Sequence, residues 1–470
     1  MSLELRLRLL QESGQISPEV AELTRWILKR VEERYDMTVT EENGAMFTTH
    51  LAVALERLRS GQAIDEMVSE GLAEVKAYPE EWAFVNEVVA GEAGRRLGEG
   101  AGGRGRLPHR APDHAGPAGR AVITRWRRSL AAARAHLGRS VAALAPGADA
   151  TDPGNEVLRL GIKDTPAIGD ELRRRLAAEP GLAWLTVDRA APGGRAVDTG
   201  LLNPLTGRPM TGSTSGGPVN ILLGIIDLCV GTDGGGSVLG PAAATGLAGI
   251  IGSGLGLTCP VERVSTDGFA FRPALGVIAR DWPTARTGFR ALLRASGAAE
   301  PPAAPLAGLR VALPRPGSVT LPDGADMAAE LEPYLRPLWA AGAEPVAVDM
   351  TGIAARERAM ALLREIWATA DLAVTLEGPV DLFGLGDSVV GSLGPPGAAL
   401  QARGGKYLLR ALNLVGCTGI ALPVPRLSSG LILAGPPGPV GAARALAAAD
   451  LLAPSLRMPP LFERYFFQLP

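Results

Sequence analysis

Histidine, lysine and cysteine are scarce in this chain of 470 residues. The four histidines lie at positions 50, 109, 114 and 136. The residues after position 136 therefore cannot contain a complete Ser-His-Asp triad. The three cysteines, at positions 229, 259 and 417, cannot all pair, and their apolar surroundings indicate buried thiols and a reducing, cytoplasmic environment. Such scattered cysteines, with no histidine after position 136, also leave no ordinary zinc site in that region.

Long apolar runs and an excess of one charge are absent too. No window reaches about 18 uninterrupted apolar residues, so the sequence predicts no membrane span. The charged first residues do not resemble a signal peptide. A formal net charge of −2 offers no basic excess for nucleic acid. With 46% apolar and 20% charged residues, the chain has an ordinary globular balance and enough length for two or three domains.

Residues 1–96 have the pattern of a helical module. Ser17 and Pro18 form a typical helix start, an N-cap followed by proline at the first helical position. Apolar residues then recur on one helix face, at Val20, Leu23, Ile27 and Val31. Further helices are expected from about Ala45 to Leu58 and from Glu80 to about Arg96.

The pattern changes after this module. Residues 97–154 contain dense glycine and proline and are predicted to be a linker with one short helix, from about Val122 to Leu137. In residues 155–470, short apolar runs such as Leu158–Ile162 and Ala183–Val187 alternate with helical patterns. The sequence therefore predicts an α/β domain that follows an all-α module.

Two glycine-rich clusters in the α/β region indicate a binding or catalytic loop. Residues 211–217 read Thr-Gly-Ser-Thr-Ser-Gly-Gly, and residues 231–237 read Gly-Thr-Asp-Gly-Gly-Gly-Ser. Glycine runs let the backbone approach a ligand and direct successive N–H groups to one spot, which suits a phosphate or an oxyanion. No Gly-Lys-Ser/Thr follows, so neither cluster is a P-loop, and the dinucleotide pattern is missing as well. Glycine turns with solvent-capped serines are the alternative.

A hydroxyl nucleophile in these clusters needs a base other than histidine. Lysine can lose its proton when it is desolvated, whereas arginine cannot. The chain has only four lysines, at positions 29, 76, 163 and 406. Lys163 follows the predicted strand Leu158–Ile162, and strand ends are common positions for catalytic groups in α/β folds. Lys163 is therefore the candidate base, with a purely structural lysine as the alternative.

The order of these motifs resembles the amidase signature. Around the two clusters, the resemblance rests on Asn203-Pro204, Pro241-Ala242, Gly246 and Gly249. Later segments that also fit are Gly276–Arg280, Gly308-Leu-Arg-Val-Ala and Asn413–Pro425. The resemblance covers about residues 155 to 455, and it implies an α/β/α sandwich with a mixed central sheet.

Members of the amidase signature family use a Ser–cisSer–Lys triad. The resemblance implies Ser237 as the nucleophile, because it follows the glycines of the second cluster. It implies Ser213, 24 residues upstream, as the bridging serine in a cis peptide bond, with Ser215 as the rival and Lys163 as the base. Backbone N–H groups that are expected to form the oxyanion hole belong to Gly234, Gly235, Gly236 and Ser237. This mechanism needs no metal and no cofactor.

The N-terminal module resembles the PRD family, helical regulatory domains that the bacterial sugar phosphotransferase system phosphorylates on histidine. The segment Met46–Gly61 matches the helix of the first conserved histidine, and Tyr78-Pro79-Glu80 matches the start of a later helix. The resemblance implies that His50 is a phosphosite and that a phosphocarrier is its partner. A half-buried helix histidine is the alternative.

Together these patterns predict a cytoplasmic amidase that cleaves a carboxamide or related C–N bond of a small molecule through an acyl-serine. Amide or acyl transfer by the same site is one alternative. A catalytically inactive PRD-type regulatory or binding protein is another. The expected partners are the small amide and the phosphocarrier at His50, a homodimer is left open, and neither nucleic acid nor a membrane is expected.

Overall fold

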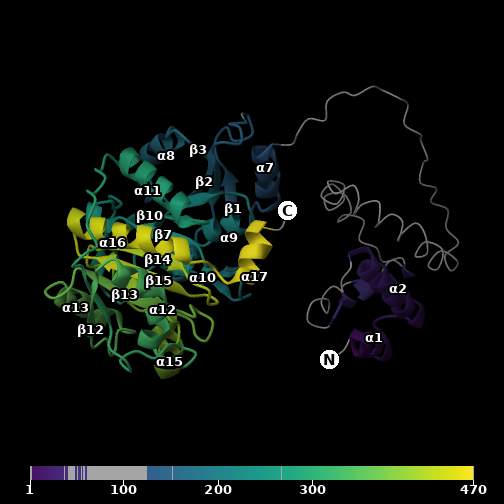
Figure 1. Cartoon of the computed structure of the whole chain (residues 1–470). Coiled ribbons are helices and arrows are strands. Elements are labelled where there is room, and N and C mark those ends of the chain that lie inside the picture. Colours follow the sequence, from purple (N-terminus) through teal and green to yellow (C-terminus); the bar gives the residue numbers. More distant parts are fainter. Residues whose placement is uncertain are drawn as a thin grey trace. The chain divides into compact units, whose positions relative to one another are not determined.

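The computed structural model describes residues 3–35, 38–40, 48–49, 51–53, 55–56, 59–60, 124–150, 152–265 and 267–468. The chain divides into two compact units, Met1–Ala118 and Gly119–Pro470, and each is described by itself (Figure 1). The helix predicted from Glu80 to Arg96 and the first part of the predicted linker, residues 97–123, lie outside the described residues. No helix in the described ranges is long and apolar enough to cross a membrane.

The described part of the first unit is helical, as predicted. It contains α1 (Leu3–Glu12), α2 (Pro18–Tyr35) and helical residues between positions 48 and 59. The predicted start of α2 is confirmed, because the N–H of Val20 donates to Ser17 Oγ at 3.3 Å. The small core of this unit includes Leu7, Ile16, Val20, Leu23, Ile27 and Leu55.

In the described residues, the second unit is built on one sheet of eleven strands. From one edge to the other, the strands are β1 (Val141–Leu144), β3 (Leu182–Asp188), β2 (Leu158–Lys163), β6 (Leu228–Asp233), β10 (Ala274–Ala279), β7 (Ala248–Ile251), β14 (Thr418–Pro423), β15 (Gly430–Gly435), β13 (Leu372–Glu377), β11 (Arg310–Pro314) and β12 (Glu344–Val348). β2 runs parallel to both of its neighbours, and so does β11, whereas the other pairs are antiparallel. The predicted mixed central sheet is therefore confirmed.

Helices cover both faces of this sheet. A Cβ atom placed on Gly288 of α11 (Trp282–Ser296) would lie 3.2 Å from Val277 of β10. A Cβ atom placed on Gly276, the residue before Val277 in the same strand, would lie 3.1 Å from Val238, which directly precedes α10 (Leu239–Thr245). Successive residues of a strand point to opposite faces, so α11 and the start of α10 lie on opposite sides. This arrangement is the predicted α/β/α sandwich (Figure 1).

The remaining elements of the second unit complete these layers and the loops between them. The helices are α7 (Arg125–Ala135), α8 (Asp170–Ala177), α9 (Gly216–Leu222), α12 (Met327–Ala340), α13 (Arg356–Ile366), α14 (Ser388–Gly391), α15 (Pro395–Ala402), α16 (Pro439–Leu452) and α17 (Pro460–Glu463). Single turns of 3₁₀-helix lie at Pro192–Gly194, Ser253–Leu255, Leu408–Arg410 and Ala453–Ser455, and a short π-helix follows α17 at Arg464–Gln468. Two small hairpins are formed by β4 (Val197–Leu202) with β5 (Pro209–Thr211) and by β8 (Arg263–Val264) with β9 (Ala270–Phe271).

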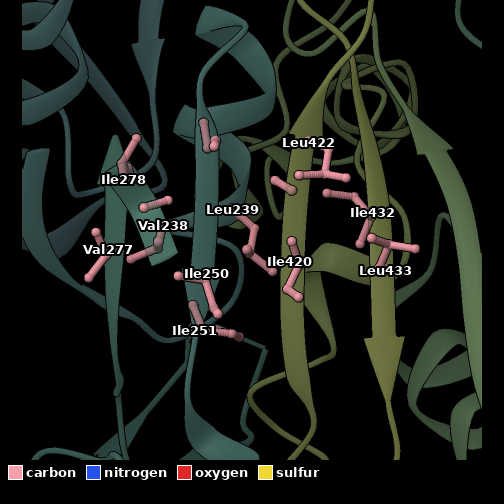
Figure 2. Packing of buried hydrophobic residues seen from close by; sticks show 14 of the residues in the cluster. Val238, Leu239, Ile250, Ile251, Val277, Ile278, Ile420, Leu422, Ile432 and Leu433 are labelled. Atoms are coloured by element: carbon pink, nitrogen blue, oxygen red, sulfur yellow. The ribbon is translucent and has the colours of Figure 1, made fainter. Parts of the chain in front are cut away.

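Branched apolar side chains cover both faces of the central strands, and those on one face pack against the start of α10. Figure 2 shows Val238 and Leu239 beside side chains from four neighbouring strands, Val277, Ile278, Ile250, Ile251, Ile420, Leu422, Ile432 and Leu433. All of these side chains are fully buried. Complete burial of one such side chain contributes about 1.5–3 kcal/mol, so this packing fixes the start of α10 against the sheet. The loop between β6 and α10 is thereby held in place.

Residues 124–150, which we predicted to be part of the linker, belong to the second unit. The predicted short helix is present as α7, and the strand after it, β1, pairs antiparallel with β3. Trp126 and Leu130 of α7 are buried in the core, and the Trp126 indole N–H donates to the carbonyl of Ala148 at 3.0 Å. α7 contains several arginines and only a narrow apolar face, so its sequence pattern does not indicate a helix that packs against the core.

Candidate active site

A cavity of about 580 Å³ opens where β2 and β6 end. Lys163, Ser213 and Ser237 all line it, so the structure brings the three predicted triad residues together. The rest of its wall includes residues from the segments 164–167, 190–196, 232–235, 263–265, 271–273 and 387–389, together with Arg356. Its volume lies within the usual range for small-molecule sites.

Lys163 is the last residue of β2, and its side chain is buried. Its Nζ donates to Ser213 Oγ at 2.7 Å and to Thr232 Oγ1 at 2.9 Å, and its exposed fraction is 3%. Within the described residues, no carboxylate forms an ion pair with it. Lys163 is therefore surrounded by hydroxyl groups at the inner end of the cavity.

This environment favours the uncharged form of the lysine. Burial lowers the pKa of Lys163 to about 7, and the nearby positive charge of Arg263 acts in the same direction. The buried carboxyl of Asp233 acts in the opposite direction but does not outweigh the burial. Near neutral pH, a large fraction of Lys163 therefore has a lone pair that can accept a proton.

The two rival serines have different partners. Ser213 lies after β5, and its Oγ is the one in contact with Lys163. Ser215 Oγ instead donates to Asp198 Oδ2 at 2.8 Å, and Asp198 is also held by Arg189. Among the described residues that line the cavity, Ser213 is present and Ser215 is not. The geometry therefore favours Ser213 as the partner of the lysine.

The cis peptide bond implied at Ser213 is not found. In the described ranges, the only cis bond joins Gly378 to Pro379, so both peptide bonds of Ser213 are trans. Gly212, with a φ of 74°, makes the turn before Ser213, and glycine adopts this conformation at little cost. The N–H of Ser213 donates to Ser237 Oγ at 3.3 Å, so the two serines meet through this backbone group.

The predicted oxyanion hole needs one correction. The N–H of Gly236 donates to Asp233 Oδ1 at 2.7 Å, and those of Val238 and Leu239 donate to Asp233 Oδ2. The N–H of Gly236 is therefore not free to bind an oxyanion, because it donates to the carboxyl of Asp233, which closes the turn between β6 and α10. The N–H groups of Gly234, Gly235 and Ser237 have no acceptor among the described residues, and all three residues line the cavity.

Gly234 and Gly236 each have a neighbour that a side chain would displace, and Gly235 lies close to an arginine. A Cβ at Gly234 would lie 2.5 Å from the ring of Phe271, and one at Gly235 would lie 3.0 Å from Arg356 Nη2. Gly236 has a φ of 97° and faces Leu409 at 2.4 Å. The carbonyl of Gly234 accepts a hydrogen bond of 3.3 Å from the side-chain amide of Asn413. The run of glycines thus lets several distant segments close around the loop.

Sequence reasoning missed several residues of this site. Thr232 and Asp233 lie inside the quoted motif, and the three N–H groups that follow Asp233 are typical of a carboxyl that closes a turn. Arg263 and Arg356 also line the cavity, but neither belongs to one of the quoted motifs.

Three further points concern groups outside this cavity. His50 lies outside the described residues, so its role as a phosphosite stays a prediction. Among the described residues, no three His, Cys, Asp or Glu side chains gather as metal ligands would. The three cysteines are buried and unpaired, as expected.

Comparisons with known proteins match different parts of the chain. Residues 22–91 match the model of the PRD domain family. Over 83 residues the chain is 35% identical to the uncharacterized protein YhfY of Escherichia coli K12, a stretch that covers 18% of this chain and 68% of that protein. The chain belongs to the PRD family. The PRD domain ends well before Lys163, so the cavity lies outside it.

The second unit has the fold of the amidase-signature enzymes. A structure of 6-aminohexanoate cyclic dimer hydrolase complexed with substrate superposes with a TM-score of 0.51 and 15% identity, over 73% of this chain and 96% of that one. A second structure of the same hydrolase gives a TM-score of 0.50 at 15% identity, over 72% and 94% of the two chains. At this identity, the comparison concerns the fold alone.

Proposed function

We propose that the second unit hydrolyses a carboxamide or related C–N bond of a small molecule through an acyl-serine intermediate. The observation that carries this proposal is the contact of 2.7 Å between buried Lys163 Nζ and Ser213 Oγ, at the wall of a cavity that Ser237 also lines. A lysine desolvated in this way is a base suited to activating a hydroxyl nucleophile. The fold, which a known hydrolase shares, agrees with this reading.

In the proposed reaction, Ser237 Oγ attacks the carbonyl carbon of the amide. Its proton passes to Ser213 Oγ, whose own proton passes to the lone pair of Lys163 Nζ. The proton then returns along the same path to the leaving amine, and the C–N bond breaks. Water, activated by the same relay, then hydrolyses the acyl-serine.

This relay requires the two hydroxyl groups to approach one another. In the structure, Ser237 Oγ accepts the N–H of Ser213, and that contact holds the nucleophile next to the bridging residue. Catalytic hydrogen bonds often shorten only when substrate is bound, so a turn of the Ser237 side chain on binding is part of the proposal. The N–H groups of Gly234, Gly235 and Ser237 are the proposed donors to the oxyanion, each contributing about 3–4 kcal/mol.

Labelling of the nucleophile tests this proposal directly. A fluorophosphonate probe should modify wild-type protein at Ser237, as identified by peptide mass spectrometry, and should not modify Ser237→Ala. Ser215→Ala is the matched control, because Ser215 Oγ donates to Asp198 and not to the triad. This substitution should leave the labelling of Ser237 largely unchanged. Modification elsewhere, or none, would contradict the acyl-serine.

Two further assays separate the alternatives. Ammonia release from a panel of small amides reports hydrolysis, and hydroxamate formation with added hydroxylamine reports acyl transfer from the same intermediate. A protein that does neither and is not labelled, yet captures a partner, is the inactive regulatory protein.

We also propose His50 as a phosphosite of the PRD domain. The support is that the family match, residues 22–91, includes this histidine. Incubation with a phosphocarrier of the sugar phosphotransferase system should label wild-type protein and leave His50→Ala unlabelled. Equal labelling of both proteins would assign the phosphate to another residue.

A further inference from the structure

Two arginine side chains approach the cavity from segments that the proposed reaction does not use. Arg263 belongs to β8, and Arg356 is the first residue of α13. Both line the cavity with Ser237. A hydrolytic relay needs no guanidinium group, so these side chains call for a separate explanation.

Arg356 is held against the glycine loop. Its side chain is 9% exposed, and its Nη1 pairs with Asp267 of the β8–β9 hairpin. Its Nη2 lies 3.0 Å from the position of a Cβ on Gly235, one of the proposed oxyanion donors. Its Nε is buried and has no acceptor among the described residues. One carboxylate therefore satisfies only part of a guanidinium that can donate five hydrogen bonds.

Arg263 adds a second charge at the wall of the cavity. A Cβ on Gly194, another lining residue, would lie 3.8 Å from Arg263 Nη1. In the described part of the chain, Arg263 has no carboxylate partner, and its charge is close enough to affect Lys163. An exposed arginine with no partner, directed along a cavity wall, is available to a ligand.

The other charges around the cavity do not neutralise this pair. The carboxyl of Asp387, also a lining residue, is taken by Arg195. Asp164 is the remaining acidic lining residue, and it is exposed. Arg410, which is 7% exposed, is close enough to interact with Arg356 and adds positive charge. The part of the cavity near Gly235 therefore presents positive charge beside the nucleophile.

From this arrangement we infer that the substrate is an amide that carries a carboxylate, which Arg263 and Arg356 bind while Ser237 faces the amide. This inference rests on the proposed hydrolysis. Planar guanidinium groups bind carboxylates through paired charge-assisted hydrogen bonds, and such binding places the reacting carbonyl at a fixed distance from the anion. A neutral amide of the same size lacks that anchor.

Matched substrate pairs test the inference. Succinamic acid and neutral succinamide differ in one carboxylate on the acyl side, and N-acetyl-β-alanine and its methyl amide differ in one on the amine side. At pH 8, we expect kcat/KM of the full chain to favour the anionic member of at least one pair by tenfold or more. Arg263→Gln should reduce that preference about tenfold by raising KM, whereas Arg128→Gln, an exposed arginine on α7, should leave it unchanged.

A binding measurement separates failure of this inference from failure of the proposed hydrolysis. Calorimetry with Ser237→Ala protein measures the affinity for each of the four compounds, whether or not the wild type hydrolyses them. Tighter binding of the anion, lost in Arg263→Gln, supports the inference even if no amide is hydrolysed. Equal binding of both members of each pair, or no binding of any carboxylate at millimolar concentration, overturns it. Arg356→Lys, which keeps the charge near Asp267, should weaken anion binding in the same direction if the paired geometry matters.

Discussion

Lys163 and Lys406 are both buried, yet their partners differ. Lys406 Nζ lies 2.7 Å from Asp381 and also donates to the carbonyl of Gly386, which is the arrangement of a structural ion pair. Lys163 meets only hydroxyl and carbonyl oxygens. The scarcity of lysine therefore marks both positions as special, and the contacts alone separate a candidate base from a structural charge.

Substitutions of the relay should follow from these contacts. We expect Lys163→Ala, Lys163→Arg and Ser237→Ala to lower kcat at least about a thousandfold, because nothing replaces the base or the bond-making oxygen. Ser213→Ala should retain more activity, since a water can bridge in its place. Ammonia release from the best amide of the panel measures each loss. Near-normal rates in Lys163→Arg would remove the lysine from the mechanism.

The dependence of the rate on pH follows from the lowered pKa of Lys163. The base must be uncharged, and burial lowers the pKa of Lys163 to about 7. The value of kcat/KM should therefore rise through about pH 7 and reach a plateau above it. The residual rate of Lys163→Ala should show no inflection there. An identical pH profile in that variant would assign the inflection to another group.

The same group makes stability depend on pH. An unfolded lysine has a pKa of about 10.4, so between pH 7 and 10 the unfolded chain holds a proton that folded Lys163 does not. Stability from this group rises with pH across that window, by up to about 1.4 kcal/mol per unit. Lys163→Met should be more stable than wild type at pH 7, with a gap in urea midpoint that narrows toward pH 10. A gap that is constant with pH would mean that Lys163 is charged when folded.

The loop between β6 and α10 is the element on which the site depends. Gly236 combines a φ of 97° with a contact that a Cβ could not tolerate, whereas Gly240 on α10 has no neighbour closer than 3.8 Å to such an atom. Gly236→Ala should therefore cost about 1–3 kcal/mol of stability and lower activity at least tenfold. Gly240→Ala should be neutral or stabilising, because alanine favours a helix. Thermal melts and ammonia release distinguish the two, and equal effects would contradict the contact argument.

Much of this element could be predicted from the sequence because its determinants are local. The glycines before Ser237, Asp233 four residues before that serine, and Lys163 at the end of a strand all lie within short motifs. The Gly236 N–H was assigned to the oxyanion hole, although Asp233, three residues earlier, is typical of a carboxyl that closes such a turn. Arg356 was missed for a different reason: its approach to Gly235 is a tertiary contact between distant segments.

At the scale of the whole molecule, the sheet explains why the site is assembled from distant segments. β2 and β6 are parallel neighbours, so Lys163 and Thr232 lie together where these two strands end, although they are 69 positions apart in the chain. β10 pairs with β6 on its other side, which places the segment 271–273 along the wall of the same cavity. The order of strands, and not proximity in the chain, thus determines which side chains meet.

The boundary between the two units gives the last prediction. A chain that begins at Gly119 keeps α7 and β1 and should fold and hydrolyse the same amide as the full chain, because every residue of the candidate site follows that point. A chain that begins at Asn155 loses Trp126, Leu130 and Val141 from the core and leaves β3 as an open edge. Removal of one large buried side chain costs about 3–5 kcal/mol, and an unpaired edge strand promotes aggregation, so this shorter chain should be insoluble or melt well below the longer one. Gel filtration, thermal melts and ammonia release compare the two chains. If the chain from Gly119 is folded but inactive, the PRD domain contributes to catalysis, and if the chain from Asn155 is as stable as the longer one, α7 and β1 are dispensable additions to the sheet.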